Sequence, residues 1–175
     1  MARFAYDIFW TALGWAAVLG SPNGLRRSVL PVATPREALD ALGAEAQRAD
    51  RDADAMAHAR SAVLAALHGT SPPPEPPFDL EGVSPFFRVA WQACRSIPMG
   101  ETRSYAWLAE AAGRPGAARA AGQAMARNRM APLVPCHRVV ASDGRLGGYG
   151  GGLALKERLL AMEAATAMPA RVALK

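Results

Sequence analysis

A run of prolines near the middle of the chain places the strongest constraint on its fold. Residues 71–77 read Ser-Pro-Pro-Pro-Glu-Pro-Pro. Because proline fixes φ and lacks a backbone N–H, this run can neither continue a helix nor donate to a sheet. We therefore expect an extended linker over residues 71–83. It separates an N-terminal unit at residues 1–70 from a second unit at residues 84–166, and residues 167–175 form a tail.

The composition is that of a soluble globular chain. Hydrophobic residues make up 51% and charged residues 20% of the 175 residues, which excludes disorder along the whole chain. The longest apolar stretch, residues 8–19, is shorter than the about 20 residues of a membrane-spanning helix, and no secretory cleavage motif follows it. The two cysteines, Cys94 and Cys136, are expected to stay reduced in the cytoplasm.

The net charge of +5 is unevenly distributed along the chain. The first 84 residues carry seven Arg against ten acidic residues, whereas the remainder carries 13 basic against five acidic residues. Seven arginines lie from Arg103 to Arg145, with only Glu110 and Asp143 as acidic residues among them. This density is typical of a surface that contacts nucleic-acid phosphates. Charge alone leaves open an arginine-rich surface without such a partner.

The N-terminal unit is predicted to be a small α+β unit. Apolar runs at residues 13–19 and 25–30 flank Ser-Pro-Asn-Gly at residues 21–24, a sequence that favours a β-hairpin. Ala and Leu then recur at helical spacing over residues 35–67, with Thr34 as the cap and proline at the first helical position. One or two helices are therefore expected after the hairpin.

The second unit is predicted to begin with a helix. Ser84 caps it, Pro85 opens it, and Ile-Pro-Met-Gly at residues 97–100 ends it. Its apolar positions recur every three or four residues: Phe86, Val89, Ala90, Ala93, Cys94 and Ile97. We interpret Cys94 as a buried thiol of this helix.

Two further helices are expected across a tight glycine-containing turn. Ser104 caps a helix over residues 105–112, and Pro115 opens another over residues 116–127. Such a pair is typical of a helix-turn-helix. The second helix consists almost entirely of small residues and carries three long polar side chains along one side: Arg119, Gln123 and Arg127. Small residues allow close approach to a ligand surface, although packing against a neighbouring helix also explains them.

Cys136 is the candidate nucleophile. His137 and Arg138 follow it directly, and positive surroundings favour the reactive thiolate. The two following valines favour a short strand over residues 135–140. Because adjacent residues on a strand point to opposite faces, we expect a bridging water rather than direct contact between the Cys136 and His137 side chains.

Two other chemistries are not supported. The possible zinc ligands include no pair at a spacing of two to five residues: His58, His68, Cys94, Cys136 and His137. His58 and His68 are interpreted as surface residues of a helix. The glycine-rich loop at residues 147–152 follows a turn at residues 142–145 and precedes a helix expected over residues 153–164. It lacks the Gly-Lys-Ser/Thr arrangement of a phosphate-binding P-loop.

Pro-Cys-His-Arg-Val-Val at residues 135–140 resembles the active-site signature of the O6-alkylguanine-DNA alkyltransferases, the methylated-DNA–protein-cysteine methyltransferases. Other segments resemble that family in the same order: residues 102–109, 117–125, Asn128 and 151–157, with weaker likeness at 14–18 and 21–25. The resemblance is strong over residues 84–165. It implies an α+β fold with a small ribonuclease H-like N-terminal domain and a mostly helical, winged-helix-like C-terminal domain that contains the helix-turn-helix.

The resemblance implies DNA repair by direct, single-use transfer of an alkyl group to Cys136. The substrates would be O6-alkylguanine and O4-alkylthymine in DNA. Glu163 would orient His137, which takes the thiol proton through a water. The Tyr105 hydroxyl would donate toward guanine N3, and Asn128 would tie the recognition helix to the turn before the active-site strand.

The resemblance also assigns residues to DNA and to the base pocket. Arg119 would fill the gap left by a flipped base. The other implied DNA contacts are Tyr105, Ala118, Ala120, Gly122, Gln123 and Arg127. The implied pocket residues are Pro132, Val134, Val139, Tyr149 and Gly150, with backbone carbonyls near Cys136 and Val139 meeting the guanine amine, whereas Val140 is assigned to the core.

Two residues depart from the family pattern. Arg129 follows Asn128 where the family usually has proline, which would loosen the turn and add a cation near DNA. Gly150 stands where some members have serine, so a donor to O6 would be its backbone N–H.

The expected partner is double-stranded DNA that carries O6-alkylguanine. No cofactor, metal or membrane is expected, and the protein would be a cytoplasmic monomer, associated with the nucleoid in a bacterium. Two alternatives remain at this point: a non-catalytic sensor that binds alkyl lesions, and a helix-turn-helix regulator.

Overall fold

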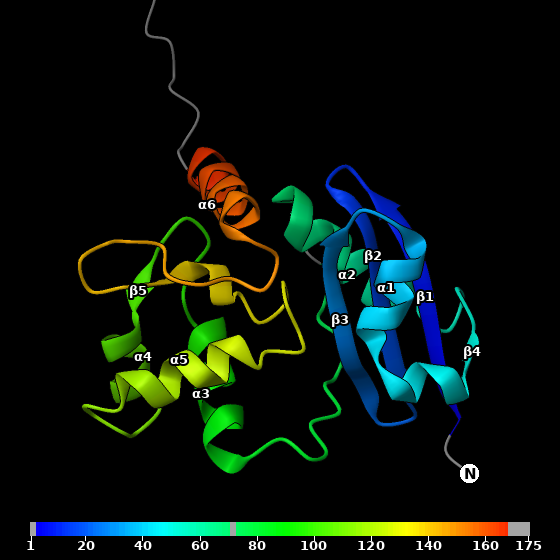
Figure 1. The fold of residues 1–175 in the computed structure, drawn as a ribbon, viewed down its shortest axis with the longest axis horizontal. Coiled ribbons are helices and arrows are strands. Elements are labelled where there is room, and N and C mark those ends of the chain that lie inside the picture. The colour runs from blue at the N-terminus through cyan, green and yellow to red at the C-terminus, as the bar shows by residue number, and fades with distance from the viewer. Residues whose placement is uncertain (1–2, 71–72, 168–175) are drawn as a thin grey trace, which may run out of the picture.

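The computed structural model describes residues 3–70 and 73–167 and has a mixed α+β architecture (Figure 1). Residues 71–72 of the expected linker and residues 168–175 of the expected tail lie outside the described residues. One side of the molecule is a sheet flanked by helices, and the other is a cluster of helices. No helix within the described ranges is long and apolar enough to cross a membrane.

The sheet begins with three antiparallel strands: β1 Phe4–Thr11, β2 Gly14–Ser21 and β3 Gly24–Val32. A short fourth strand, β4 Ala49–Arg51, pairs in parallel with β1, which gives the order β3-β2-β1-β4. The expected hairpin is confirmed as β2 and β3. The β1–β2 hairpin was missed, because residues 8–19 were read as one apolar stretch although they turn back between Thr11 and Gly14.

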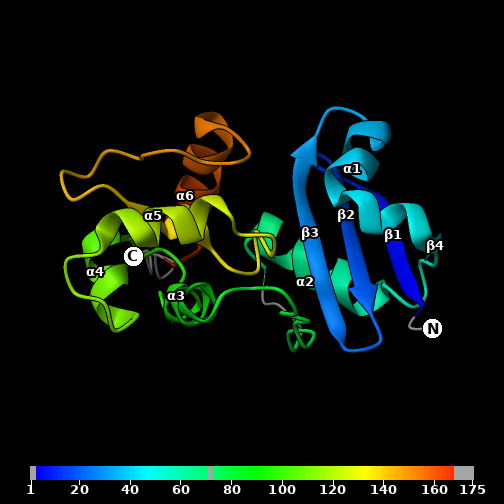
Figure 2. The same cartoon turned by 60° about the horizontal axis from the view of Figure 1, so that its bottom comes forward.

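Helices cover both faces of the sheet. The expected helices are α1 Pro35–Leu42 and α2 Ala57–His68, with a 3-10 helix Ala44–Arg48 between them. Figures 1 and 2 show α1 and α2 on opposite faces. Accordingly, alternate side chains of β2 are buried on opposite faces. Ala17 and Leu19 pack with side chains of α1, whereas Ala16 and Val18 pack with side chains of α2. Burial on both faces explains why β2 reads as a continuous apolar run.

Up to residue 167, the second half contains four α-helices, a 3-10 helix and a two-stranded parallel sheet. Its elements are α3 Pro85–Arg95, β5 Arg103–Ser104, α4 Tyr105–Ala111, α5 Ala118–Ala126, β6 Val139–Val140 and α6 Leu153–Ala167. The Ser84 and Ser104 side chains cap α3 and α4 as expected, accepting hydrogen bonds from backbone N–H groups.

Two details of these helices differ from the expectation. Helix α5 begins at Ala118 rather than residue 116, because Gly116 has φ +80° and so ends the preceding turn instead of continuing a helix. Val89 is 46% exposed although it was assigned to the apolar stripe of α3, whereas Ala90 and Cys94 of that stripe are buried as expected.

The proline-rich linker is attached to the N-terminal sheet. The Leu25 N–H of β3 donates to the Pro77 carbonyl at 2.7 Å, and the Asp79 N–H donates to the Leu25 carbonyl at 2.8 Å. Beyond the linker, one hydrophobic cluster contains residues of both halves, including Val63 and Leu67 of α2. The sheet and the helical half therefore share a core.

Candidate active site

Cys136 lies in a 3-10 turn, Cys136–Arg138, that leads directly into β6. This corrects the strand expected over residues 135–140. Only Val139 and Val140 have a partner strand, because β5 is two residues long, and the Cys136 carbonyl accepts from the Val139 N–H to close the turn instead. The opposite-face argument for Cys136 and His137 therefore does not apply.

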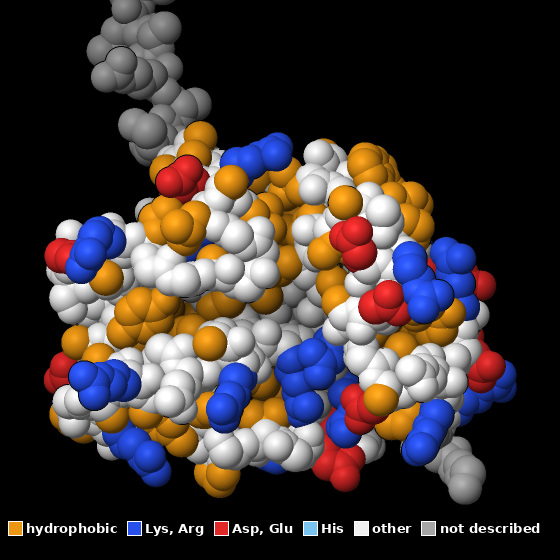
Figure 3. All heavy atoms as spheres, viewed as in Figure 1, with side chains coloured by type: hydrophobic (Ala, Val, Ile, Leu, Met, Phe, Trp, Pro, Cys, Tyr) orange, Lys and Arg blue, Asp and Glu red, His pale blue; other side chains and the backbone are white. Residues whose placement is uncertain are grey.

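A cavity of about 420 Å³ lies between α5 and the loop that connects β6 to α6. Its lining residues are Tyr105, Gly122, Met125, Ala126, Cys136, Gly148, Tyr149 and Gly150. Cys136 is 8% exposed. Figure 3 shows hydrophobic side chains in a groove between that loop and α5. The thiol thus borders a cavity whose walls include two aromatic rings and several glycines.

The expected pocket residues divide into two groups. Tyr149 and Gly150 line the cavity, whereas Pro132, Val134 and Val139 are buried and are not among its lining residues. Pro132 instead lines a separate cavity of about 230 Å³. Val140 is buried, as its assignment to the core implied.

Asn128 contacts the sulfur of Cys136. Its Nδ2 lies 3.2 Å from Cys136 Sγ and donates to the Val134 carbonyl at 2.8 Å, while its Oδ1 accepts from the Met130 N–H at 2.9 Å. Burial raises the pKa of the Cys136 thiol, and the hydrogen bond from Asn128, followed by the charge of Lys156, opposes that rise. Asn128 is therefore placed to stabilise a thiolate.

His137 and Glu163 form a buried pair behind the thiol. His137 Nε2 lies 2.8 Å from Glu163 Oε1, and each side chain is 1% exposed. Within the described part of the chain, His137 Nδ1 has no hydrogen-bond partner. The pair thus leaves one ring nitrogen available to a proton donor.

Arg138 also binds the Glu163 carboxylate. Its Nε and Nη2 donate to the two carboxylate oxygens at 2.9 and 2.8 Å, and its Nη1 donates to the Ile97 carbonyl at 2.7 Å. Burial alone would raise the pKa of Glu163, but hydrogen bonds from His137 and Arg138 lower it to about 2. Sequence reasoning did not find this role, because no motif signals which carboxylate an arginine will meet.

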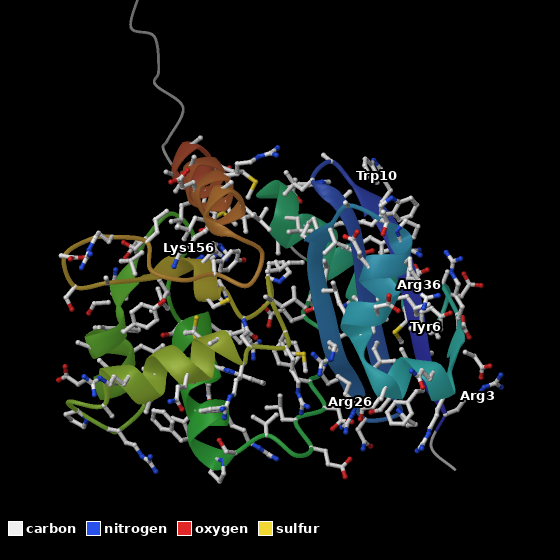
Figure 4. The ribbon with its side chains drawn as sticks, viewed as in Figure 1. Arg3, Tyr6, Trp10, Arg26, Arg36 and Lys156 are labelled. Carbon is white, nitrogen blue, oxygen red and sulfur yellow. The ribbon has the colours of Figure 1, made fainter. Side chains whose placement is uncertain are left out.

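Lys156 is a second residue that sequence reasoning missed. It is fully buried, and its Nζ donates to the Val139 carbonyl at 2.7 Å and to the Leu146 carbonyl. Figure 4 shows Lys156 inside the loop that connects β6 to α6. Burial lowers its pKa. Lys156 ties the residue that precedes the glycine-rich loop to β6, and it occupies one lone pair of the Val139 carbonyl that was expected to meet guanine.

Tyr105, the first residue of α4, lines the cavity together with Cys136. Two glycines pass close to its ring: a Cβ on Gly147 would lie 3.2 Å from the Tyr105 hydroxyl, and one on Gly122 would lie 3.9 Å from the ring. Burial raises the pKa of Tyr105, so the hydroxyl keeps its proton and remains a donor.

Helix α5 presents its long polar side chains to solvent. Arg119, Gln123 and Arg127 are exposed, as expected, while the small residues Ala118, Ala120 and Gly122 are partly buried. Arg119 makes no hydrogen bond or ion pair with the described residues. Figure 3 shows Lys and Arg side chains along α5 and toward β3. Behind α5, the Trp91 indole N–H of α3 donates to the Ala124 carbonyl at 2.8 Å.

The remaining sequence interpretations concern thiols and histidines. Cys94 is buried and has a raised pKa, mainly because of burial, as expected for a core thiol. His58 and His68 are exposed on α2, as predicted. No group of three His, Cys, Asp or Glu side chains within residues 3–70 and 73–167 is arranged to hold a metal ion.

Comparisons with known proteins agree on one family. The model for the DNA binding domain of 6-O-methylguanine DNA methyltransferase matches residues 85–165. A methylated-DNA–protein-cysteine methyltransferase of Mycolicibacterium paratuberculosis is 56% identical over 85 residues, which cover 49% of this chain and 51% of that relative. The bifunctional transcriptional activator/DNA repair enzyme Ada of Escherichia coli is 44% identical over 119 residues, 68% of this chain and 33% of that protein. The chain thus spans about half the length, or less, of these relatives.

A solved structure extends the likeness to both halves. The Mycobacterium tuberculosis OGT in complex with DNA has a TM-score of 0.77 and 34% sequence identity, and the comparison covers 95% of this chain and 96% of that one.

Proposed function

Because the chain belongs to the 6-O-methylguanine DNA methyltransferase family, we propose that it repairs DNA by moving an alkyl group from guanine O6 to Cys136. The observation that carries the proposal is the position of the thiol, which borders a cavity of about 420 Å³ while Asn128 donates to its sulfur. A cavity of this size, with few polar groups near a perturbed thiol, is typical of a small-molecule or base pocket.

The residues around Cys136 supply each part of a displacement reaction. His137 takes the thiol proton at Nδ1 through a water, while its Nε2 stays bonded to Glu163. The thiolate attacks the alkyl carbon, the C–S bond forms, and the C–O6 bond breaks with its electron pair passing to guanine. The Tyr105 hydroxyl, donating toward N3, stabilises the guanine anion until a proton returns to the base. Because a thioether is a poor leaving group, each molecule reacts once.

Access to a base in duplex DNA requires the base to leave the stack. Helix α5 is assigned to the minor groove, where its small residues permit close approach and Arg119 fills the gap left by the flipped nucleotide. Arg127, Gln123 and the backbone near Ala118, Ala120 and Gly122 then contact the phosphodiester chain without reading sequence. The exposure of Arg119 and its lack of partners among the described residues support this role.

Membership of the same family supports a finer proposal for the protein. Residues 84–166 form the DNA-binding and alkyl-acceptor domain with a winged-helix-like arrangement, joined by residues 71–83 to an N-terminal domain at residues 1–70. The antiparallel β1–β3 meander with a parallel strand beside β1 supports a ribonuclease H-like description of that domain. The substrates are O6-alkylguanine and O4-alkylthymine in double-stranded DNA, and the protein works in the cytoplasm as a monomer without cofactor or metal.

The test is the intact mass of the protein after incubation with duplex DNA that contains one O6-methylguanine. We expect one added methyl group per molecule, located on Cys136 by peptide mapping. Cys136→Ala should bind the same DNA and gain no mass. Cys94→Ala is the matched control and should react like the wild type, because Cys94 is buried in the core. Tight binding without any mass change would contradict the proposal and favour a lesion sensor.

A further inference from the structure

The turn at residues 128–131, which follows α5, is hydrogen-bonded to the N-terminal sheet. The Ser28 N–H in β3 donates to the Arg129 carbonyl at 2.8 Å, and the Ser28 hydroxyl donates to the Ala131 carbonyl at 2.7 Å. Ser28 is 6% exposed, so these bonds are shielded from water. Figures 1 and 2 both show the segment after α5 alongside β3. One residue of the sheet therefore holds two points of this turn: its backbone N–H binds the Arg129 carbonyl, and its side chain binds the Ala131 carbonyl.

The same turn carries the donor to the reactive sulfur. Asn128 precedes the two carbonyls bound by Ser28, and its amide contacts Cys136 Sγ at 3.2 Å. A cavity of about 210 Å³ is lined by both Ser28 and Asn128, which shows that the two residues face a common space. A displacement of the turn at Ser28 would consequently move the amide that faces the sulfur.

Within the turn, the Asn128 side chain bonds to the Met130 N–H and to the Val134 carbonyl, but the backbone at position 129 lacks the restraint of a proline ring. Arg129 occupies the position where the related family usually has proline, so φ is not fixed by a ring there. Arg129 is partly buried and donates from Nη2 to the Glu81 carbonyl at 2.7 Å. Contacts from outside the turn, with β3 and with the linker, thus replace the missing proline.

We propose that Ser28 is a positioning residue for alkyl transfer: from the N-terminal sheet it fixes the turn that aims the Asn128 amide at the Cys136 sulfur. The inference rests on the proposed function of Cys136 as acceptor. Through Ser28, the N-terminal half would help to position a side chain that contacts the reactive sulfur. When Ser28 loses its hydroxyl, the turn relaxes, the Asn128 donor moves, and the thiolate loses a hydrogen bond that offsets its burial.

The test measures alkylation of Cys136 by iodoacetamide as a function of pH, followed by peptide mapping, and requires no DNA. Ser28→Ala should react about tenfold more slowly near neutral pH, and its rate profile should shift to higher pH, because one charge-assisted hydrogen bond to the thiolate is weakened. Ser28→Thr retains the hydroxyl and should restore the wild-type profile. Ser21→Ala is the matched control, since Ser21 bonds to Asp79 of the linker and not to the turn.

A double variant tests whether Ser28 acts through Asn128. In an Asn128→Ala background, Ser28→Ala should slow alkylation no further, because the donor that it positions is already absent. A folded Ser28→Ala protein with the wild-type rate profile would overturn the proposal, as would an undiminished effect in the Asn128→Ala background. If Ser28→Ala does not fold, Ser28→Cys replaces it in the test, because a thiol has a similar shape and is a weaker donor. The rate profile of Ser28→Cys must then shift to higher pH, by less than is expected for Ser28→Ala.

The same proteins separate this proposal from the proposed function. If the wild type transfers no methyl group from O6-methylguanine DNA, the proposed function fails. The iodoacetamide profiles still decide whether Ser28 controls the thiol. If the wild type transfers methyl groups and Ser28→Ala does so at the same rate, only the role of Ser28 is wrong.

Discussion

The Glu163 carboxylate binds two cationic or potentially cationic neighbours at once, His137 and Arg138. Its pKa is lowered from 4.5 to about 2, so the charged carboxylate stabilises the folded protein above pH 4.5, and that contribution is lost as the pH falls toward 2. We expect Glu163→Gln to reduce the free energy of unfolding near neutral pH by about 3 kcal/mol, the equivalent of this shift. Urea denaturation measures the difference.

The pH dependence of that difference is the sharper observation. The gap in unfolding free energy between the wild type and Glu163→Gln should shrink between about pH 4.5 and about pH 2, as the wild-type carboxyl becomes protonated. Glu110→Gln, a change on the exposed side of α4, should show no gap at any pH. A gap for Glu163→Gln that stays constant down to low pH would mean that the carboxylate charge contributes nothing.

Residues of the site differ in how far the sequence could predict them. Cys136 and His137 stand in a recognisable motif, and Glu163 followed from family resemblance. Lys156 and Ser28 could not be predicted, because each acts on a backbone carbonyl that only the fold brings near. The Ser28 hydroxyl and the Ala131 carbonyl, for example, are 103 positions apart in the sequence.

Helix α5 is the element that should distinguish repair in duplex DNA from reaction with a free base. Under the proposed function, Arg119→Ala should slow methyl transfer from duplex DNA by about tenfold or more, because the gap left by the flipped nucleotide would stay unfilled, yet leave reaction with a free O6-alkylated guanine base unchanged. Single-turnover rates on the two substrates measure this. Arg158→Ala, an exposed arginine on α6, is the control. Equal slowing on both substrates would exclude the role assigned to Arg119.

Elements with local signals were predictable, and those that depend on distant partners were not. The sequence predicted that three side chains would cap helices α1, α3 and α4, and the structure confirms all three caps: Thr34, Ser84 and Ser104. The 3-10 turn at Cys136 was mistaken for a strand, because valine preference indicates extended backbone but says nothing of whether a partner strand reaches that far.

At the scale of the whole molecule, the two halves share one hydrophobic cluster despite the linker between them. We expect a single cooperative unfolding transition. Leu67→Ala in the buried face of α2 should lower the free energy of unfolding by about 2–5 kcal/mol. Far-ultraviolet circular dichroism and the fluorescence of the tryptophans should report the same shifted midpoint. Midpoints that differ between the two probes, or two steps in either curve, would contradict a single cooperative transition.

The contact between Trp91 and the Ala124 carbonyl bears on how α5 resists force. Under the proposed function, a side chain of α5 that enters between stacked base pairs must unstack them, and the helix must hold its position against that resistance. The Trp91 hydrogen bond to Ala124 connects α5 to α3, and Ala124 and Trp91 both belong to the shared core. The consequence for the proposed function is that α5 needs no bulky side chains of its own for support, because the contact with α3 behind it supplies that support.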